Sequence, residues 1–284
     1  MTTAPALPRT ARVLITLVVG YLVILLVGPV VAVILQAFSQ GVRPLWESLT
    51  QPTVLHAFVM TLWIALATVV VCTVFGTVVA YVLVRQRFIG RSLLNGLVDL
   101  PFAVSPVVAG LMYILVFGRG GWLEPWAEAA GVKIIFNWPG MLLATIFVSI
   151  PFVIREVMPV LQSRGMDEEQ AAYTLGASRW LAFWRVTVPG IKWGLFYGIV
   201  LTFARAMGEF GAVLVVSGGI SGRTETATLF IFRSLDERQE VAAAGAALVM
   251  ASLSLMILIF MELIKRAPAS ERTIAHRAGV VRTQ

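Results

Sequence analysis

The chain has 284 residues, of which 58% are hydrophobic and only 13% are charged, and its formal net charge is +7. Because soluble domains average about 25% charged residues, this composition and the mean hydropathy of +0.88 exclude an ordinary soluble domain and indicate an integral membrane protein. The single cysteine, Cys72, lies in an apolar run, and His56 and His276 are far apart in the sequence. We therefore expect neither a disulfide nor a metal site.

Six long apolar segments follow a short polar arm at residues 1–12. Each is expected to form a transmembrane helix, since about 20 apolar residues span a bilayer. The predicted spans are 13–37, 57–84, 92–117, 138–160, 193–216 and 241–264. The first is too long for the apolar part of a cleavable signal. The predicted fold class is all-α, with one transmembrane domain over residues 13–264 and a basic tail at 265–284.

Lys and Arg are distributed unevenly between alternate connecting segments. With the N-terminus in the cytoplasm, 15 of the 22 basic residues fall in cytoplasmic segments and 6 in outer ones, while Arg205 lies within the fifth span. Because cytoplasmic loops carry an excess of Lys and Arg, both termini and the polar segment 162–192 are expected on the cytoplasmic side. The net positive charge then reflects topology, and no nucleic-acid partner is expected.

The third apolar segment is interrupted by Pro101 and Pro106. Proline in a membrane helix frees backbone groups, which then need protein or a water-filled cavity as partners. Ser105 followed by Pro106 is typical of an N-cap and first helical position, so a half-helix is expected to begin there. Its first N–H groups, including that of Val107, would suit an anion near the membrane midplane. A proline kink that only shapes helix packing is the alternative interpretation.

The polar segment 162–192 is expected to form two short helices. Asp167 and Gln170 have the spacing of a capping box, which predicts a helix start, and small residues such as Gly176 would lie along that helix. Ser178 is expected to cap a second helix, rich in Trp and Phe with flanking Arg, a composition typical of a membrane interface. Proline at position 189 is expected to end it.

This segment resembles the EAA loop of the membrane subunits of ABC importers. In that pattern Glu-Ala-Ala is followed at fixed spacing by glycine and then by an aliphatic residue and aliphatic-Pro. The matching residues here are Gln170, Ala171, Ala172, Gly176, Val186, Val188 and Pro189. Gln170 stands where the family usually has Glu, and Asp167, Glu168 and Glu169 place negative charge beside it. The resemblance implies that the segment couples the chain to an ATPase.

The fifth apolar segment contains two charged residues one helical turn apart, Arg205 and Glu209. A charge at this depth is costly, about 3 kcal/mol or more, and must face protein or water rather than lipid. One interpretation is that Arg205 lines a pathway and offsets the charge of a passing anion. The other is a structural ion pair. Gly194 and Gly198 predict that this span packs closely on a partner helix, and the partner could belong to this chain or to another subunit.

Three further stretches narrow the resemblance to permeases of the CysW type, from sulfate/thiosulfate importers. They are Asp99–Gly110, Arg205–Val213 and Ser217–Thr226. The second stretch also resembles a signature that sulfate and molybdate permeases share. A molybdate or tungstate permease is therefore the alternative within the family.

The resemblance implies a MetI-like permease fold in the bacterial inner membrane and a set of partner proteins. These are a CysA-like ATPase dimer, a second membrane subunit of the CysT type giving a heterodimer, and a periplasmic sulfate/thiosulfate-binding protein. The chain has no G-x-x-x-x-G-K-[ST] phosphate loop, so no cofactor is expected in it, and ATP and Mg would be bound by the ATPase.

Two other classes of function compete with an importer subunit. A membrane enzyme is disfavoured because the sequence has no H-E-x-x-H or G-x-S-x-G motif. An ion-coupled transporter could use Arg205, Glu209 and Asp99, but it would leave the EAA-like segment unexplained.

Overall fold

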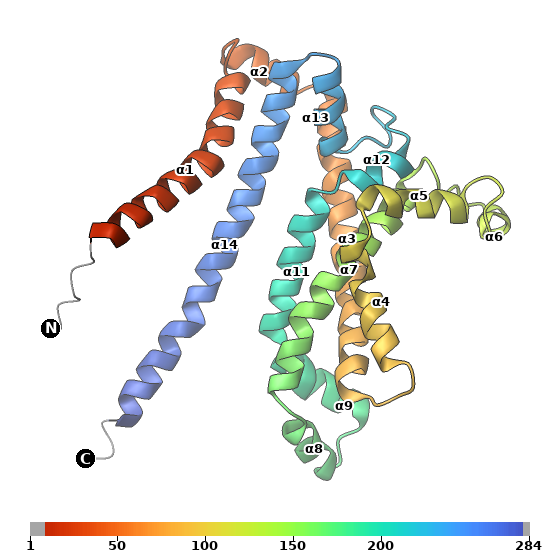
Figure 1. The fold of residues 1–284 in the computed structure, drawn as a ribbon. Helices are drawn as coiled ribbons and strands as arrows, with labels where there is room; N and C mark the ends of the chain where they lie inside the picture. Colours follow the sequence, from red (N-terminus) through yellow and green to blue (C-terminus); the bar gives the residue numbers. More distant parts are fainter. Residues whose placement is uncertain (1–8, 281–284) are drawn as a thin grey trace. The chain divides into compact units, whose positions relative to one another are not determined.

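The computed structural model describes residues 9–280 and, for side chains, residues 10–264 (Figure 1). The expected polar arm therefore lies outside the described residues up to residue 8, and the expected tail does so from residue 281. Residues 9–280 form helices and connecting turns without any strand, as the predicted fold class requires. The helices are α1 Arg9–Ala37, α2 Val42–Leu49, α3 Pro52–Arg85, α4 Arg91–Ala103, α5 Pro106–Phe117, α6 Glu124–Ala129, α7 Trp138–Ser163, α8 Asp167–Thr174, α9 Arg179–Ala182, the π-helical turn η1 Phe183–Thr187, α10 Val188–Gly190, α11 Lys192–Met207, α12 Gly211–Ser217, α13 Ala227–Asp236 and α14 Glu240–Val280.

The chain divides into two compact units. The smaller comprises residues up to Gln51 together with Ile231–Val249, and the larger comprises Pro52–Phe230 together with residues from Met250 onward. In the smaller unit, α1, α2 and the start of α14 bury a small apolar cluster of Ala37, Leu45, Val241 and Ala244. The functional residues predicted from the sequence all belong to the larger unit.

The larger unit is built around α7, which packs against both α3 and α11. Val153 of α7 is fully buried at the centre of this packing. A Cβ atom added to Gly76 of α3 would lie 3.0 Å from the Val153 Cβ, and one added to Gly198 of α11 would lie 2.9 Å from the Val153 Cα. Glycine is therefore what allows both helices to approach α7 so closely. For the predicted Gly194–Gly198 ridge, the partner helix is α7 of the same chain.

Two of the predicted spans are broken, the first of them at the expected Ser105–Pro106 pair. The 92–117 span consists of α4 and α5, which are bent by 112° at a break where Val104 is extended. The 193–216 span consists of α11 and α12, separated at residues 208–210. Pro106 explains the first break, because proline cannot donate a hydrogen bond to the preceding turn.

Four unbroken helices within the described residues are long and apolar enough to cross a membrane. They are Thr10–Ala37, Pro52–Arg85, Trp138–Ser163 and Glu240–Ile264, and the count rises to six if the bent pairs α4–α5 and Arg179–Gly190 with α11 are each taken as one span. The expected number of six membrane spans is therefore reached only when each of the two bent helix pairs is counted as one span.

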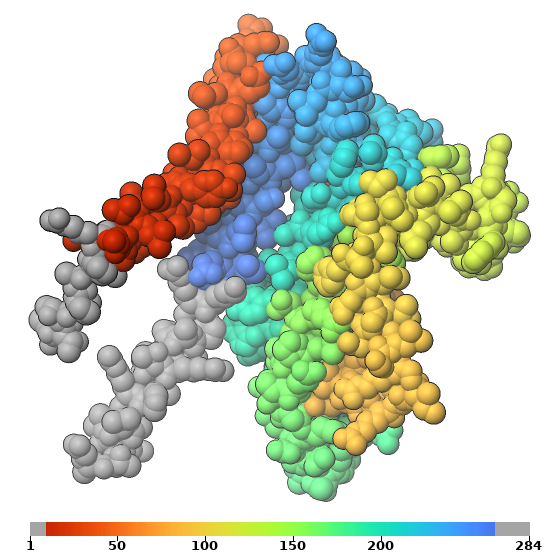
Figure 2. Space-filling model, in the orientation of Figure 1, coloured from red at the N-terminus to blue at the C-terminus, as the bar shows by residue number. Residues whose placement is uncertain are grey.

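The predicted loops contain helices of their own. The segments 38–56, 118–137 and 217–240 hold α2, α6 and α13 respectively. The apolar segment 241–264 does not end at the predicted tail, since α14 continues to Val280. The residues around α6 project from the rest of the larger unit. Both the ribbon and the space-filling view show this projection in yellow-green (Figures 1 and 2).

Candidate functional site

The predicted coupling segment lies at the end of the larger unit where α3 and α7 end and α11 begins (Figure 1). Within it, α8 is a two-turn helix whose one buried residue is Glu169. No apolar side chain of α8 is buried, so the hydrophobic effect does little to seat this helix. Its attachment to the bundle depends on polar contacts.

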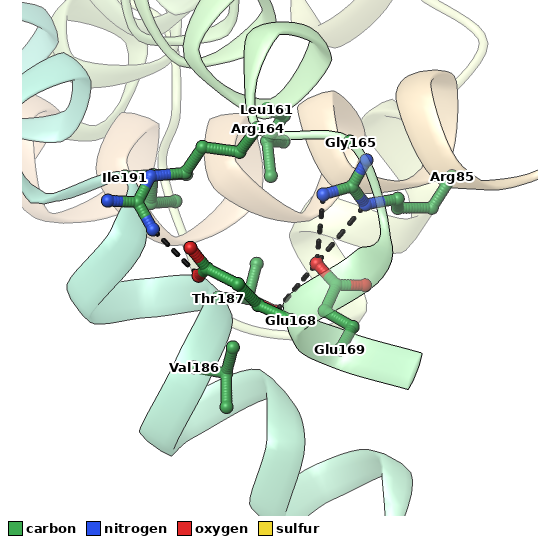
Figure 3. A pocket seen from close by; sticks show the side chains of 9 residues that line it. All are labelled: Arg85, Leu161, Arg164, Gly165, Glu168, Glu169, Val186, Thr187 and Ile191. Atoms are coloured by element: carbon green, nitrogen blue, oxygen red, sulfur yellow. Dashed lines mark hydrogen bonds and ion pairs between the residues drawn. The ribbon is translucent and has the colours of Figure 1, made fainter. Parts of the chain in front are cut away.

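The Glu169 carboxylate is the centre of those contacts (Figure 3). Its Oε1 atom accepts hydrogen bonds from Nε and Nη2 of Arg85, at 3.2 and 3.0 Å, and from the Thr187 hydroxyl at 3.1 Å. Only 6% of the Arg85 side chain and 4% of the Glu169 side chain are exposed. A buried charge is tolerated only when it is paired and hydrogen-bonded, and this carboxylate is both. It joins α8 to the last residue of α3 and to η1.

A second ion pair closes the same corner at the surface. Arg164, at the end of α7, donates to Glu168 at 2.8 Å, and both side chains are about half exposed. The Arg164 guanidinium also covers the backbone of Gly190, where an added Cβ would lie 2.9 Å from its Nη1. The two ion pairs border a cavity of about 10 Å³, and Figure 3 shows the side chains that line it.

The start and end of α8 differ from the sequence interpretation. Asp167 is its first residue rather than its cap, since Met166 is the N-cap and makes no side-chain capping bond. Gly176 does not lie along the helix, which ends at Thr174. It follows the helix with φ +86°, a conformation that L-residues with a Cβ rarely adopt.

The second predicted helix begins as expected but ends later. The Ser178 side chain accepts from the backbone N–H of Leu181, as an N-cap does. Pro189 does not end this helix, which continues to Gly190 and then bends by 71° into α11. The π-helical turn directly before Pro189 widens the helix, which accommodates a residue that cannot donate.

Several residues of the segment remain available to a partner. Gln170 and Ala171 are exposed, as are the large apolar side chains of Leu175, Trp180 and Trp184. Such an exposed apolar surface is unusual for a monomeric protein and typical of an interaction site. Glu169, in contrast, directs its charge inward, so Asp167 and Glu168 carry the exposed negative charge of this segment.

The predicted ion pair of the fifth span is present. Arg205 Nη1 lies 2.6 Å from Glu209 Oε2, with 28% of the Arg205 side chain and 2% of the Glu209 side chain exposed. Glu209 also accepts from the backbone N–H of Ala212, at 2.9 Å, and its carbonyl accepts from the Thr228 hydroxyl. The pair therefore occupies the break between α11 and α12 and holds the start of α12.

The two breaks lie against each other, because α5 packs on α12. A Cβ atom added to Gly211, the first residue of α12, would lie 3.1 Å from the Pro106 Cβ and 3.4 Å from the Val107 nitrogen. Ser105 occupies the N-cap position as expected, but its side chain makes no capping hydrogen bond. The fold thus brings the two groups of predicted pathway residues into one region.

A polar cluster between α4 and α7 was not predicted as a unit. Arg155 donates from Nε to Asp99 at 2.8 Å and from Nη1 to the Asn95 side chain at 3.0 Å. About half of the Asp99 side chain and a third of the Arg155 side chain are exposed. These residues are 56 and 60 positions apart, so only the packing of α4 on α7 reveals the contact.

Comparison with known proteins agrees with this architecture. The family described as "Binding-protein-dependent transport system inner membrane component" matches residues 72–269. The chain belongs to this family. It shares 47% identity over 96% of its length with the sulfate transport system permease protein CysW of Synechocystis, and the match covers 98% of that protein. Against CysW of Escherichia coli K12 the identity is 47%, over 84% of this chain and 81% of the relative. Against CysT of the same organism it is 39%, over 84% and 86%.

Solved structures extend the comparison to the fold. A chain of the crystal structure of a bacterial ABC transporter that imports the acidic polysaccharide alginate matches with a TM-score of 0.75, at 16% identity, over 91% of this chain and 95% of that one. At that identity the likeness concerns the fold alone. The inner membrane component described here therefore has the MetI-like fold of ABC importer permeases.

Proposed function

We propose that this chain is the permease subunit of an ATP-driven importer for sulfate or thiosulfate. The observation that carries this proposal is the 47% identity, over 96% of the chain, to a sulfate transport system permease. The EAA-like segment adds an independent reason, because it connects the chain to ATP hydrolysis and so favours an importer over an ion-coupled transporter or a membrane enzyme.

In this proposal the chain catalyses no reaction, and its role is to form the pathway. An ATPase dimer binds ATP and Mg, and a periplasmic binding protein delivers the anion. A permease protein from such a system, CysT, is also similar to this chain, which supports a heterodimer of two related membrane subunits. A structure of the alginate transporter with its periplasmic protein bound gives the general arrangement for a chain of this fold.

The exposed side of the coupling segment receives the ATPase. Asp167, Glu168, Gln170 and Ala171 present polar and small groups at the surface. Gly176 lies in the turn that follows α8, and Pro189 lies in the helix that leads to α11. Both termini lie in the cytoplasm, since the Lys and Arg distribution places them on the side of this segment.

The anion passes beside the two helix breaks. Ser105, Pro106 and Val107 begin α5, and its N-terminal N–H groups favour negative charge. Arg205 adds a cation that is partly exposed, while buried Glu209 holds it in place. A guanidinium whose charge is already balanced by a carboxylate attracts a dianion weakly enough to release it, which passage requires.

Uptake of labelled sulfate tests the proposal. Cells carrying the chain should accumulate sulfate in an ATP-dependent manner, and cells lacking it should not. Excess thiosulfate should compete and excess molybdate should not. Equal sulfate uptake without the chain contradicts the proposal, and stronger competition by molybdate assigns the chain to molybdate or tungstate import instead.

A further inference from the structure

The inner end of α3 meets the coupling segment at three points. Besides the Arg85–Glu169 ion pair, Tyr81 of α3 contacts the ring of Phe183 in η1, with centroids 5.4 Å apart, and interacts through its hydroxyl with Tyr173 of α8. Tyr81 and Arg85 are one helical turn apart and so lie on the same face of α3. This face forms a platform beneath both short helices of the segment.

No covalent connection requires this arrangement. Along the chain, the segment continues from α7 and leads into α11, whereas α3 is separated from α8 by 84 residues at the ion pair. A helix such as α8, with no buried apolar side chain, would be free to pivot about its two chain ends. Glu169 restricts that freedom because one of its two carboxylate oxygens, Oε1, accepts hydrogen bonds both from Arg85 of α3 and from Thr187 of η1.

From this geometry we infer that Arg85 is a positioning residue for energy coupling, and that α3 receives the motion of the coupling segment directly. This inference rests on the proposed function of the chain as an importer permease. Buried ionic contacts of fixed geometry transmit displacement because they switch between discrete arrangements rather than stretch. A movement imposed on the surface of α8 therefore displaces α3 together with α7 and α11.

The surface ion pair Arg164–Glu168 supplies a matched control. It lies on the adjacent residue of the same helix, but its side chains are 45% and 60% exposed. Exposed pairs contribute little, whereas removal of one partner of a buried pair leaves an uncompensated charge. The two pairs therefore have the same chemistry and differ in burial.

The test uses the assembled importer in proteoliposomes, with sulfate uptake and ATP hydrolysis measured in the same sample. For Glu169→Gln and for Arg85→Gln we expect sulfate imported per ATP to fall by about tenfold, because the remaining charge is left buried without its partner and coupling between two sites is typically worth about 5–150-fold. Arg164→Gln, which removes the exposed pair but leaves Glu168 on the docking surface, should stay near wild type. The double variant Arg85→Gln/Glu169→Gln should recover part of the loss, because two neutral amides can hydrogen-bond to each other.

The amount of ATPase that co-purifies with each variant separates coupling from assembly. The inference requires Glu169→Gln to retain the ATPase and to hydrolyse ATP while importing less sulfate. Wild-type import per ATP in Glu169→Gln and Arg85→Gln overturns the inference, and so does a loss of import that only follows a loss of bound ATPase. If the wild-type assembly shows no ATP-dependent sulfate uptake, the proposed function fails, and the inference fails with it.

Discussion

At the scale of single residues, two buried glutamates of the larger unit are held in the same way. Glu169 and Glu209 each have less than 5% of the side chain exposed and each faces an arginine. Each also accepts a further hydrogen bond, from Thr187 or from the backbone of Ala212. In a chain with few charges, these two buried carboxylates lie where the backbone changes direction, Glu169 in the segment after α7 and Glu209 in the break between α11 and α12.

Arg205 is expected to matter for transport beyond stability. Replacing Arg205 with Ala removes the partly exposed guanidinium and leaves Glu209 buried without its partner, a change that costs about 3–5 kcal/mol in buried pairs. Because the cation beside the proposed pathway is lost, we expect sulfate uptake per membrane-inserted molecule to fall about tenfold. Arg43→Ala, which removes an exposed pair, is the control. Unchanged uptake with a lower protein level would assign Arg205 to structure alone.

Gly176 is expected to tolerate few replacements. Its φ of +86° disfavours a Cβ, by about 1–2 kcal/mol per residue, although no neighbouring atom blocks the space. Gly176→Val should therefore weaken retention of the ATPase and lower uptake while the protein still inserts into the membrane. Gly176→Asn should be milder, since Asn tolerates this conformation. Normal uptake and ATPase retention by Gly176→Val would count against a docking role for this turn.

At the scale of helices, glycine positions determine which elements pack. Gly194 and Gly198 allow α11 to lie against the backbone of α7, where the Glu156 carbonyl oxygen would be 2.8 Å from a Cβ at Gly194. Gly110 likewise allows α5 to approach α12, since a Cβ atom added at Gly110 would lie 2.8 Å from the Ala212 carbonyl oxygen. The small residues seen in the sequence thus mark contacts within this chain.

Gly198→Leu is expected to disrupt the larger unit. Its side chain would collide with the α7 backbone at Val153, and overpacking of this kind costs about 1–3 kcal/mol or more. Gly208→Ala, at the C-cap of the same helix, is the control, because a Cβ there meets nothing closer than the Ala204 carbonyl oxygen at 3.8 Å. Thermal unfolding in detergent should show a lower midpoint for Gly198→Leu only, and equal midpoints would show that α7 and α11 adapt.

At the scale of the whole molecule, the helix breaks and the coupling segment define two ends of one helical unit. The segment from α8 to α10 lies where α3 and α7 end, and α12 and the start of α5 lie toward their other ends (Figure 1). An importer needs this separation, because the ATPase acts on one side of the membrane and the anion arrives from the other.

The orientation of this unit can be tested with one added cysteine. The native Cys72 is fully buried, so it should give little background labelling. A cysteine at Ala171, which is exposed on α8, should react with a membrane-impermeant maleimide only in inside-out vesicles. Reaction in intact spheroplasts would place the coupling segment outside and reverse the proposed topology.

The sequence by itself determined the class of this protein. Hydropathy located the apolar helices, the Ser105–Pro106 pair located one break, and the spacing from Gln170 to Pro189 indicated an importer subunit. These features are local, because they depend on helix propensity, proline geometry and short motifs. The pairing of Arg205 with Glu209 was equally local, since one helical turn separates them.

Only the tertiary structure decided which distant residues meet. Nothing near Glu169 in the sequence indicates Arg85, and nothing near Arg155 indicates Asp99, because these contacts join different helices. The sequence interpretation likewise missed two features: the break between α11 and α12, and the continuation of the helix past Pro189 to Gly190. An apolar pattern does not distinguish a straight helix from a bent one. Packing against α7 and burial of polar groups fix these features, and both depend on the whole chain.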